Sequence, residues 1–170
     1  MSDSLGAVVI AVEPFDSEAT RWVVARAEAE LEDRYGFIDA GEYGLLAAEF
    51  DPPAGAFLLA RLRRAGARPV GGVGLRRVAE ESGKTGGETG EVKRLWVQAD
   101  WRGRGVGRAL MAELEAAARD LGLSRLRLET GERQPEAVAL YAAEGWLRQD
   151  EAWDGGPIRC GSIHFSKQLS

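Results

Sequence analysis

The chain has 170 residues, of which 45% are hydrophobic and 29% charged, a globular composition. Its net charge of -5 and isoelectric point near 5.1 argue against the basic surface that general nucleic-acid binding needs. No stretch approaches the ~20 apolar residues of a membrane span, and the N-terminus lacks a signal-peptide pattern. We therefore expect one domain over residues 1–170, with no nucleic-acid or membrane partner.

The first half of the chain predicts a strand followed by one long helix. Residues 7–13 are a short apolar run, and Asp16 or Ser17 can cap a helix that runs to about Arg34. The predicted apolar stripe of that helix is Val24, Ala27, Leu31 and Tyr35. Its acidic residues, which we expect to face solvent, are Glu28, Glu30, Glu32 and Asp33.

A short helix and a pair of strands are expected next. The helix lies around residues 45–50 and must end at Pro52-Pro53, because proline cannot continue it. Strands at 56–63 and 69–78 are joined by a hairpin turn at 64–67. Residues 80–90 are polar and glycine-rich, which predicts a flexible connection within the domain.

The second half alternates strands and helices. A strand at 91–97 precedes a glycine-rich turn, and an amphipathic helix then extends from Val106 to Leu121 and stops at Gly122. A strand at 125–129, a helix at 135–144 and strands near 146–151 and 158–167 complete the chain. This order predicts an α/β (α+β) fold in which helices flank a mixed sheet.

The single cysteine and the single histidine lie near the C-terminus. One cysteine cannot form an intramolecular disulfide, which favours a reducing, cytoplasmic location. Cys160 and His164 are four residues apart in a strand-like segment, where they would stand well apart. We expect Cys160 to be buried or chemically ordinary, and a lone histidine makes neither a metal site nor a catalytic triad. No metal is therefore expected.

Residues 102–109, Arg-Gly-Arg-Gly-Val-Gly-Arg-Ala, connect a strand to a helix. The first turn of a helix has unpaired N–H donors and the positive end of the helix dipole. The glycines let an anion approach the backbone, and the arginines supply charge that suits phosphate oxygens. A diphosphate or similar polyanion is the predicted ligand. The turn lacks the Gly-Lys-Ser/Thr end of a Walker A loop and the Gly-x-Gly-x-x-Gly spacing of a Rossmann fingerprint.

Two motifs between Glu91 and Trp146 resemble those of the GNAT superfamily of N-acetyltransferases. Residues 102–107 match its Arg/Gln-x-x-Gly-x-Gly/Ala motif. Residues 134–146, Gln-Pro-Glu-Ala-Val-Ala-Leu-Tyr-Ala-Ala-Glu-Gly-Trp, match Asn-x-x-Ala-x-x-Leu-Tyr-x-x-x-Gly-Phe. The resemblance implies a single GNAT-like domain with a mixed, mostly antiparallel twisted sheet.

The resemblance also implies acetyl-CoA as acyl donor and a primary amine of a small molecule or peptide as acceptor. The strand at 91–97 would splay from its neighbour, so that its main chain pairs with the pantetheine arm. The implied donor contacts are Leu95, Trp96, Val97, Arg102, Gly103, Arg104, Gly105, Val106, Gly107, Arg108 and Gln134. Gln134 stands where the family pattern prefers Asn, which is the better helix cap.

Direct attack of the amine on the thioester is expected, because no Ser-His-Asp or Cys-His set is visible. Tyr141 matches the tyrosine acid of the family, and a phenol with a pKa of about 10 stays protonated at neutral pH. Glu91 opens its strand where the family often places a base, although Glu129 competes and a water-mediated route is open. A backbone N–H near Trp96 or Val97 is the expected oxyanion donor.

The acceptor is not identified by the sequence. Its pocket would be formed by the N-terminal helices, residues 80–90 and the loop at 150–157. Of the five tryptophans, only Trp153 in that loop is expected near the acceptor. A non-catalytic acyl-CoA-binding or sensor domain is the alternative function, an enzyme for longer acyl chains is a third, and a homodimer is left open.

Overall fold

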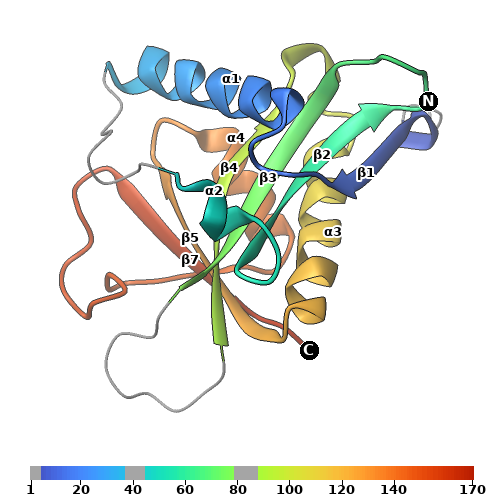
Figure 1. Ribbon diagram of the computed structural model, residues 1–170. Coiled ribbons are helices and arrows are strands. Elements are labelled where there is room, and N and C mark those ends of the chain that lie inside the picture. Colours follow the sequence, from blue (N-terminus) through green and yellow to red (C-terminus); the bar gives the residue numbers. More distant parts are fainter. Residues whose placement is uncertain (1–4, 37–44, 79–87) are drawn as a thin grey trace.

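One seven-stranded sheet, in the order β1-β2-β3-β4-β5-β7-β6, runs through the protein (Figure 1). The computed structural model describes residues 5–36, 45–78 and 88–170. All neighbouring strands are antiparallel except β4 and β5, which are parallel. The strands are β1 (Val8–Val12), β2 (Gly55–Leu62), β3 (Pro69–Val78), β4 (Glu88–Val97), β5 (Leu123–Gly131), β6 (Leu147–Arg148) and β7 (Ser162–Gln168).

Helices cover both faces of the sheet. The two on one face are α1 (Glu18–Tyr35) and α2 (Ala47–Phe50), and those on the other are α3 (Val106–Asp120) and α4 (Pro135–Ala143) (Figure 1). Short 3-10 helices are η1 (Leu5–Ala7) and η2 (Ala99–Trp101). The predicted class, a mixed and mostly antiparallel sheet flanked by helices, is therefore confirmed. Within the described segments, no helix has the length and apolar character needed to cross a membrane.

Alternation along β2 builds a core on each face of the sheet. Phe57 and Leu59 pack with Val23 of α1 and Phe50 of α2 on one side. The side chains of β2 that point the other way join a larger cluster under α3 and α4. Besides Leu110 of α3, this cluster contains residues from five strands: Ala56 and Leu58 of β2, Leu75 of β3, Val92 of β4, Leu126 of β5 and Phe165 of β7. Burial on both faces explains why residues 56–60 of β2 are continuously apolar.

The helix α1 begins and ends as its capping residues predict. The Ser17 hydroxyl accepts a hydrogen bond from the Thr20 backbone N–H at 3.1 Å, and Gly36 closes the helix with φ 77°. The expected stripe is correct only in part. The buried residues are Thr20, Val23 and Ala27. The helix therefore turns Val23, and not the neighbouring Val24, toward β3 and β4.

Three strands have a boundary that differs from expectation by three residues or more. The strand predicted at 91–97 starts earlier, at Glu88, while residues 79–87 lie outside the described segments. The strand predicted at 146–151 is only Leu147–Arg148, and the one predicted at 158–167 begins at Ser162. Gly155 and Gly161 have φ values of 81° and 83°, so the intervening backbone turns and cannot continue a strand.

Candidate functional site

The two parallel strands at the centre of the sheet separate part-way along their length. Their ladder pairs Glu88 with Leu123 at one end and Glu91 with Arg127 at the other, where it stops. Beyond that point β4 pairs only with β3, and β5 only with β7. The register of β3 and β4 shifts beside Arg94, which has a φ of 55°, so a bulge bends β4 away from β5. The splay implied by the family resemblance is present.

A cleft of about 610 Å³ fills the space that the splay opens. Residues 92–96 of β4 and 128–134 of β5 and the turn after it form its sides. The C-terminal half of α1 and the start of α4 close it, through Leu31, Arg34, Ala137 and Tyr141. A cleft lined by β4 main chain offers hydrogen-bonding groups that β5 would otherwise have satisfied.

The glycine-rich turn lies between β4 and α3, at the upper edge of the molecule (Figure 1). Gly103 and Gly105 adopt φ values of 70° and 85°, a left-handed conformation that favours glycine. Gly105 caps α3 without a side-chain hydrogen bond, and the first bond of the helix runs from Ala109 N to Gly105 O. The N–H groups of residues 106–108 therefore precede the helical ladder and can face an anion.

Gly107 differs from the other two glycines of the turn in its backbone conformation and its surroundings. Its φ is not left-handed, but a Cβ at this position would lie 3.4 Å from Leu140 Cδ2 of α4. Gly107 of α3 therefore lies close to Leu140 of α4, which belongs to the second motif. The two motifs meet in the fold at this contact.

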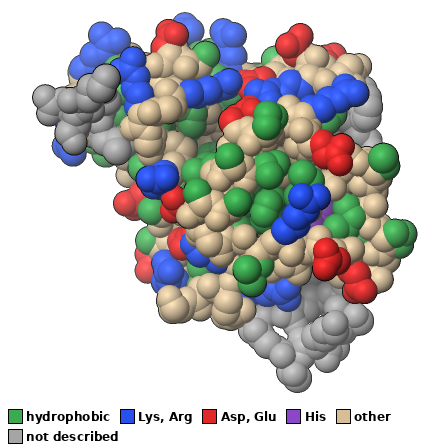
Figure 2. All heavy atoms as spheres, turned by 180° about the vertical axis from the view of Figure 1, so that it is seen from behind, with side chains coloured by type: hydrophobic (Ala, Val, Ile, Leu, Met, Phe, Trp, Pro, Cys, Tyr) green, Lys and Arg blue, Asp and Glu red, His purple; other side chains and the backbone are tan. Residues whose placement is uncertain are grey.

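The three arginines of the turn each have a partner within the protein. Arg102 donates to Val97 O at 2.8 Å and to a Glu30 carboxylate oxygen at 2.6 Å. Arg108 pairs with Glu144 at 2.6 Å. Arg104 lies over the Trp101 ring, 5.1 Å from its centroid. Lys and Arg side chains gather along this upper edge when the molecule is viewed from behind (Figure 2).

The acidic face of α1 is only partly solvent-facing, which corrects the expectation for Glu28 and Glu30. Glu30 binds Arg102, Arg34 and the Trp96 indole N–H, and it lines the cleft. Burial opposes ionisation of Glu30, but Arg102 and Arg34 outweigh it and hold the pKa of that carboxyl below its ordinary value. Glu28 lies 3.5 Å from Arg94. A helical wheel alone could not place these pairs, since their partners are on β4 and the turn.

Tyr141 of α4 is 5% exposed and lines the cleft. Its ring packs against Trp146 and Phe165, with centroid separations of 5.8 and 5.7 Å. Burial raises the pKa of the phenol above its ordinary value of 10.0. The hydroxyl is therefore protonated throughout the neutral range and is chemically suited to donate a proton.

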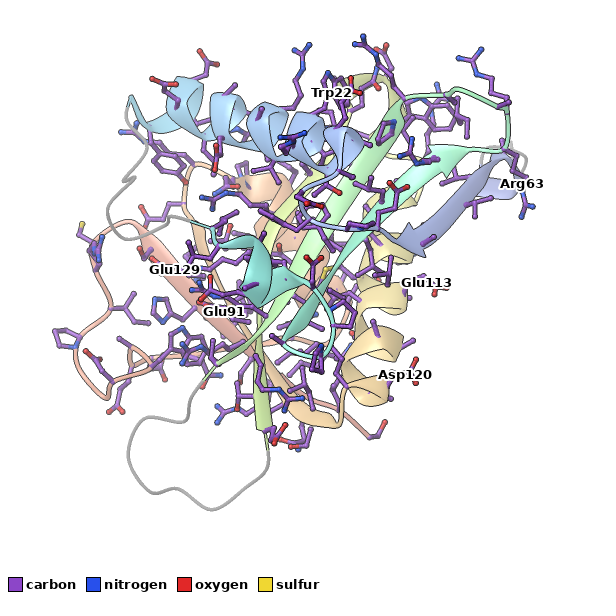
Figure 3. All side chains as sticks on the ribbon, in the orientation of Figure 1. Trp22, Arg63, Glu91, Glu113, Asp120 and Glu129 are labelled. Atoms are coloured by element: carbon purple, nitrogen blue, oxygen red, sulfur yellow. The ribbon has the colours of Figure 1, made fainter. Side chains whose placement is uncertain are left out.

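Glu91 is buried in an ion-pair network on the α1 and α2 side of the sheet (Figure 3). One carboxylate oxygen accepts from Arg76 Nη2 at 2.8 Å and Nε at 3.0 Å, and the other lies 3.2 Å from Lys93 Nζ. Burial opposes ionisation, but Lys93, Arg76 and Arg127 outweigh it and hold the pKa of Glu91 below its ordinary value. Glu91 does not line the cleft, whereas Lys93 does.

Glu129 stands on the same face, two residues beyond the end of the β4–β5 ladder, and lines the cleft (Figure 3). It accepts a hydrogen bond from the Ser162 hydroxyl at 2.6 Å and lies 3.8 Å from His164 Nε2. Burial lowers the pKa of His164, which is stacked on Trp153 at 5.0 Å. His164 therefore lies between Trp153 and Glu129, a carboxylate that lines the cleft.

The remaining predicted donor contacts divide into two groups. Leu95, Trp96 and Gln134 line the cleft, whereas Val97 does not. Gln134 occupies the N-cap of α4 without a capping hydrogen bond, and its amide donates to the Tyr35 hydroxyl at 3.4 Å. Sequence reasoning did not anticipate Tyr35 at this place. Cys160 was expected to be buried or chemically ordinary; it is exposed and lies at the cleft, so the buried alternative is wrong.

In the part of the chain that the structure describes, no cluster of three or more His, Cys, Asp or Glu residues could hold a metal ion. The cleft is instead lined by the main chain of β4, the Tyr141 phenol and carboxylates that include Glu129, and the glycine-rich turn follows beyond the end of β4. They suit an anionic, extended ligand and proton transfer at the point where the strands part.

Comparison with known proteins identifies the family to which the chain is similar. A model of the acetyltransferase (GNAT) family matches residues 15–146. The chain is 44% identical over 73 residues to an IAA acetyltransferase of Azospirillum brasilense. That match covers 43% of this chain and 48% of the relative, so it spans about half the length of the curated protein.

Solved structures share the fold over nearly the whole chain. A Klebsiella pneumoniae protein assigned as an acyl-CoA N-acyltransferase has a TM-score of 0.72 and 26% identity, with 96% of this chain and 98% of that one covered. A Staphylococcus aureus acetyltransferase of the GNAT family has a TM-score of 0.72 and 14% identity, over 96% and 100% of the two chains. An Elizabethkingia anophelis family member with acetyl-CoA bound has a TM-score of 0.61 and 18% identity, over 96% and 99%.

Proposed function

Since the chain belongs to the GNAT acetyltransferase family, we propose that it transfers an acetyl group from acetyl-CoA to a primary amine of a small molecule or peptide. The observation that carries the proposal is the continuity of the site. The cleft between β4 and β5 is followed directly along β4 by the left-handed glycines that open α3. An acyl-CoA has a thioester on a long arm with a diphosphate at its far end, so the arm would lie in the cleft and the diphosphate at the glycines.

The donor would be held mainly by main chain. The N–H groups of residues 103–108 suit the diphosphate, and the main chain of residues 95–97 suits the amide-bearing arm. Because Arg102 is paired with Glu30, its proposed role is to hold the turn against β4 and α1 while retaining charge near the phosphates. Bound acetyl-CoA supplies an activated thioester whose thiolate leaves readily.

Two protons must move, and residues in or near the cleft offer a group for each. Tyr141, buried and protonated, is the proposed donor to the departing thiolate. Glu91 is the proposed acceptor of the amine proton, through water, since its ion pairs keep it ionised but out of the cleft. Glu129 is the competing acceptor and lines the cleft. The backbone N–H of Trp96 or Val97 is the proposed oxyanion donor.

The experiment that tests the proposal is CoA release across a panel of primary amines. Release should require both acetyl-CoA and an amine. Because the exposed Cys160 also reacts with the thiol reagents that detect CoA, the enzyme is kept dilute so that its own signal stays small. Glu91→Gln and Glu129→Gln, compared in the same assay from pH 6 to 9, distinguish the two bases. The base is the residue whose loss lowers turnover by about 10²-fold or more across this pH range.

A non-catalytic acyl-CoA sensor is the rival function. It predicts thermal stabilisation by acetyl-CoA with no CoA release for any amine of the panel. Retention of Tyr141 at the cleft favours catalysis. We place the protein in the cytoplasm on the strength of its single cysteine.

A further inference from the structure

A second pocket, of about 600 Å³, lies beside the segment that leads from β4 into the glycine-rich turn. Three segments that are distant in sequence meet there: the first turns of α1, the loop between β2 and β3, and the end of β4 with η2. The side chains that characterise this pocket are Trp22, Arg26, Arg64, Arg68, Gln98 and Trp101. Figure 3 shows Trp22 at the end of the molecule where α1 begins.

The charge of this pocket is one-sided. Arg26, Arg64 and Arg68 line it, and no acidic residue is among the described residues that do. None of the three forms an ion pair within residues 5–36, 45–78 and 88–170. Two other arginines of α1 and β2 are paired, Arg34 with Glu30 and Arg61 with Glu13. Three uncompensated cations in an acidic chain mark a place for an anion.

Two of these arginines are held in position by an indole ring. The guanidinium carbons of Arg26 and Arg68 lie 5.3 and 5.6 Å from the centroid of the Trp22 ring. Trp22 is itself packed edge-on against Trp96 at 5.8 Å. Stacking uses the face of a guanidinium group and leaves the N–H donors at its edge free for an oxyanion. Side chains already held in place lose less entropy when a ligand binds.

The pocket adjoins the site proposed for the diphosphate. Gln98 and Trp101 line it and immediately precede the turn that begins at Arg102. Arg104 of the turn lies over Trp101, which extends the cationic surface from the turn toward the pocket. A second phosphate group bound here would therefore lie beside the first.

We propose that this pocket binds a phosphate monoester. Three arginines from two elements suit a dianion better than a single carboxylate, because each can donate charge-assisted hydrogen bonds to its three terminal oxygens. Two sources carry this chemistry. One is the 3′-phosphate of the CoA donor, a reading that rests on the proposed function. The other is a separate phosphorylated small molecule.

The first arm of the test compares CoA with dephospho-CoA, which lacks only the 3′-phosphate. Dissociation constants are measured by calorimetry for the wild type and for Arg64→Ala/Arg68→Ala. If the donor is the source, the double variant binds CoA about tenfold or more weakly and binds dephospho-CoA as the wild type does. Arg21→Ala is the matched control, because Arg21 is exposed on α1 and does not line the pocket.

The second arm titrates inorganic phosphate into protein saturated with CoA and follows the melting temperature. If the source is a separate molecule, phosphate stabilises the wild type and Arg21→Ala but not the double variant. Equal CoA affinities in the first arm together with equal phosphate responses in the second would overturn the proposal. Failure of the wild type to bind either form of CoA would refute the proposed function instead, and the phosphate titration without CoA would still test the pocket.

Discussion

The two sides of the central cleft differ in polarity. On the α3 and α4 side the wall is an apolar core, into which Tyr141 projects beside Trp146 and Phe165. On the α1 and α2 side the wall is charged: Lys93 lines the cleft, and behind it Glu91 binds Lys93 and Arg76. The sheet separates them, because alternate residues of β4 and β5 point to opposite faces.

This difference separates two tasks. The apolar wall and the glycine-rich turn present backbone and one phenol, which suit the proposed acyl-CoA donor. The charged wall presents side chains, which can differ between proteins and thereby select an acceptor. Changes to the first should alter the chemistry or the binding of donor, and changes to the second should alter stability and the choice of amine.

The largest effect is expected from Glu91→Gln, which breaks the charged wall. The side chain is 7% exposed, so its loss leaves Arg76 and Lys93 buried with reduced compensation and should lower the unfolding free energy by about 3 kcal/mol. Urea denaturation at pH 7 measures this. The matched control is Glu113→Gln, because Glu113 is exposed on α3 and points to solvent (Figure 3). Equal stabilities of the two variants would contradict the prediction.

The same pair of variants predicts a pH dependence. The pKa of Glu91 is lower in the folded protein than its ordinary value of 4.5, so its ionised form stabilises the fold above that value. This contribution is lost as the pH falls through the folded pKa. The stability gap between wild type and Glu91→Gln should therefore be full at pH 6 and narrow below pH of about 4. A constant gap would show that the ion pairs are not responsible.

Tyr141→Phe tests the apolar wall. The phenyl ring keeps its packing against Trp146 and Phe165, so acetyl-CoA affinity should be nearly unchanged while turnover falls by about 10²-fold. Steady-state kinetics and calorimetry separate the two quantities. Tyr35→Phe is the control, since Tyr35 also lines the cleft and its hydroxyl only accepts from Gln134. Similar turnover losses in both variants would remove Tyr141 as the acid.

A smaller effect is expected from Gly103→Ala in the turn. The Cβ would meet nothing within 4 Å, but φ is 70°, so the backbone strain should cost about 1 kcal/mol. Gly122→Ala, at the other end of α3, has the same open space and a φ of 77°. Thermal denaturation should show comparable losses for both, while only Gly103→Ala should also weaken acetyl-CoA binding. Weakened binding in Gly122→Ala as well would mean that helix stability alone sets donor affinity.

The smallest effect is expected from Arg102→Gln, which releases the turn from the charged wall. The side chains of Arg102 and Glu30 are 37% and 29% exposed, so the pair should contribute less than about 1 kcal/mol. The difference in melting temperature from wild type should shrink at 1 M salt, where charges are screened within about 3 Å. A difference that is large and independent of salt would point to the hydrogen bond with Val97 O instead.

Much of the fold follows from local patterns. Ser17, Gly36, Gly105 and Gly122 mark the ends of α1 and α3 because caps depend on a few neighbouring residues. The loop at 149–161 was less predictable. Its apolar residues resemble strand, but two left-handed glycines interrupt the backbone, and strand pairing depends on β7 and not on the segment itself.

The sequence by itself located the glycine-rich turn that opens α3 and the tyrosine of α4, because both belong to contiguous motifs with local geometry. Only the tertiary structure decided which charges meet. Glu91 and Arg76 are fifteen residues apart, and Glu30 and Arg102 seventy-two. No local rule pairs residues at such separations, since the pairs depend on the register of β3 with β4 and on where α1 crosses them. The same is true of the arginines around Trp22, which only the folded chain brings to one pocket.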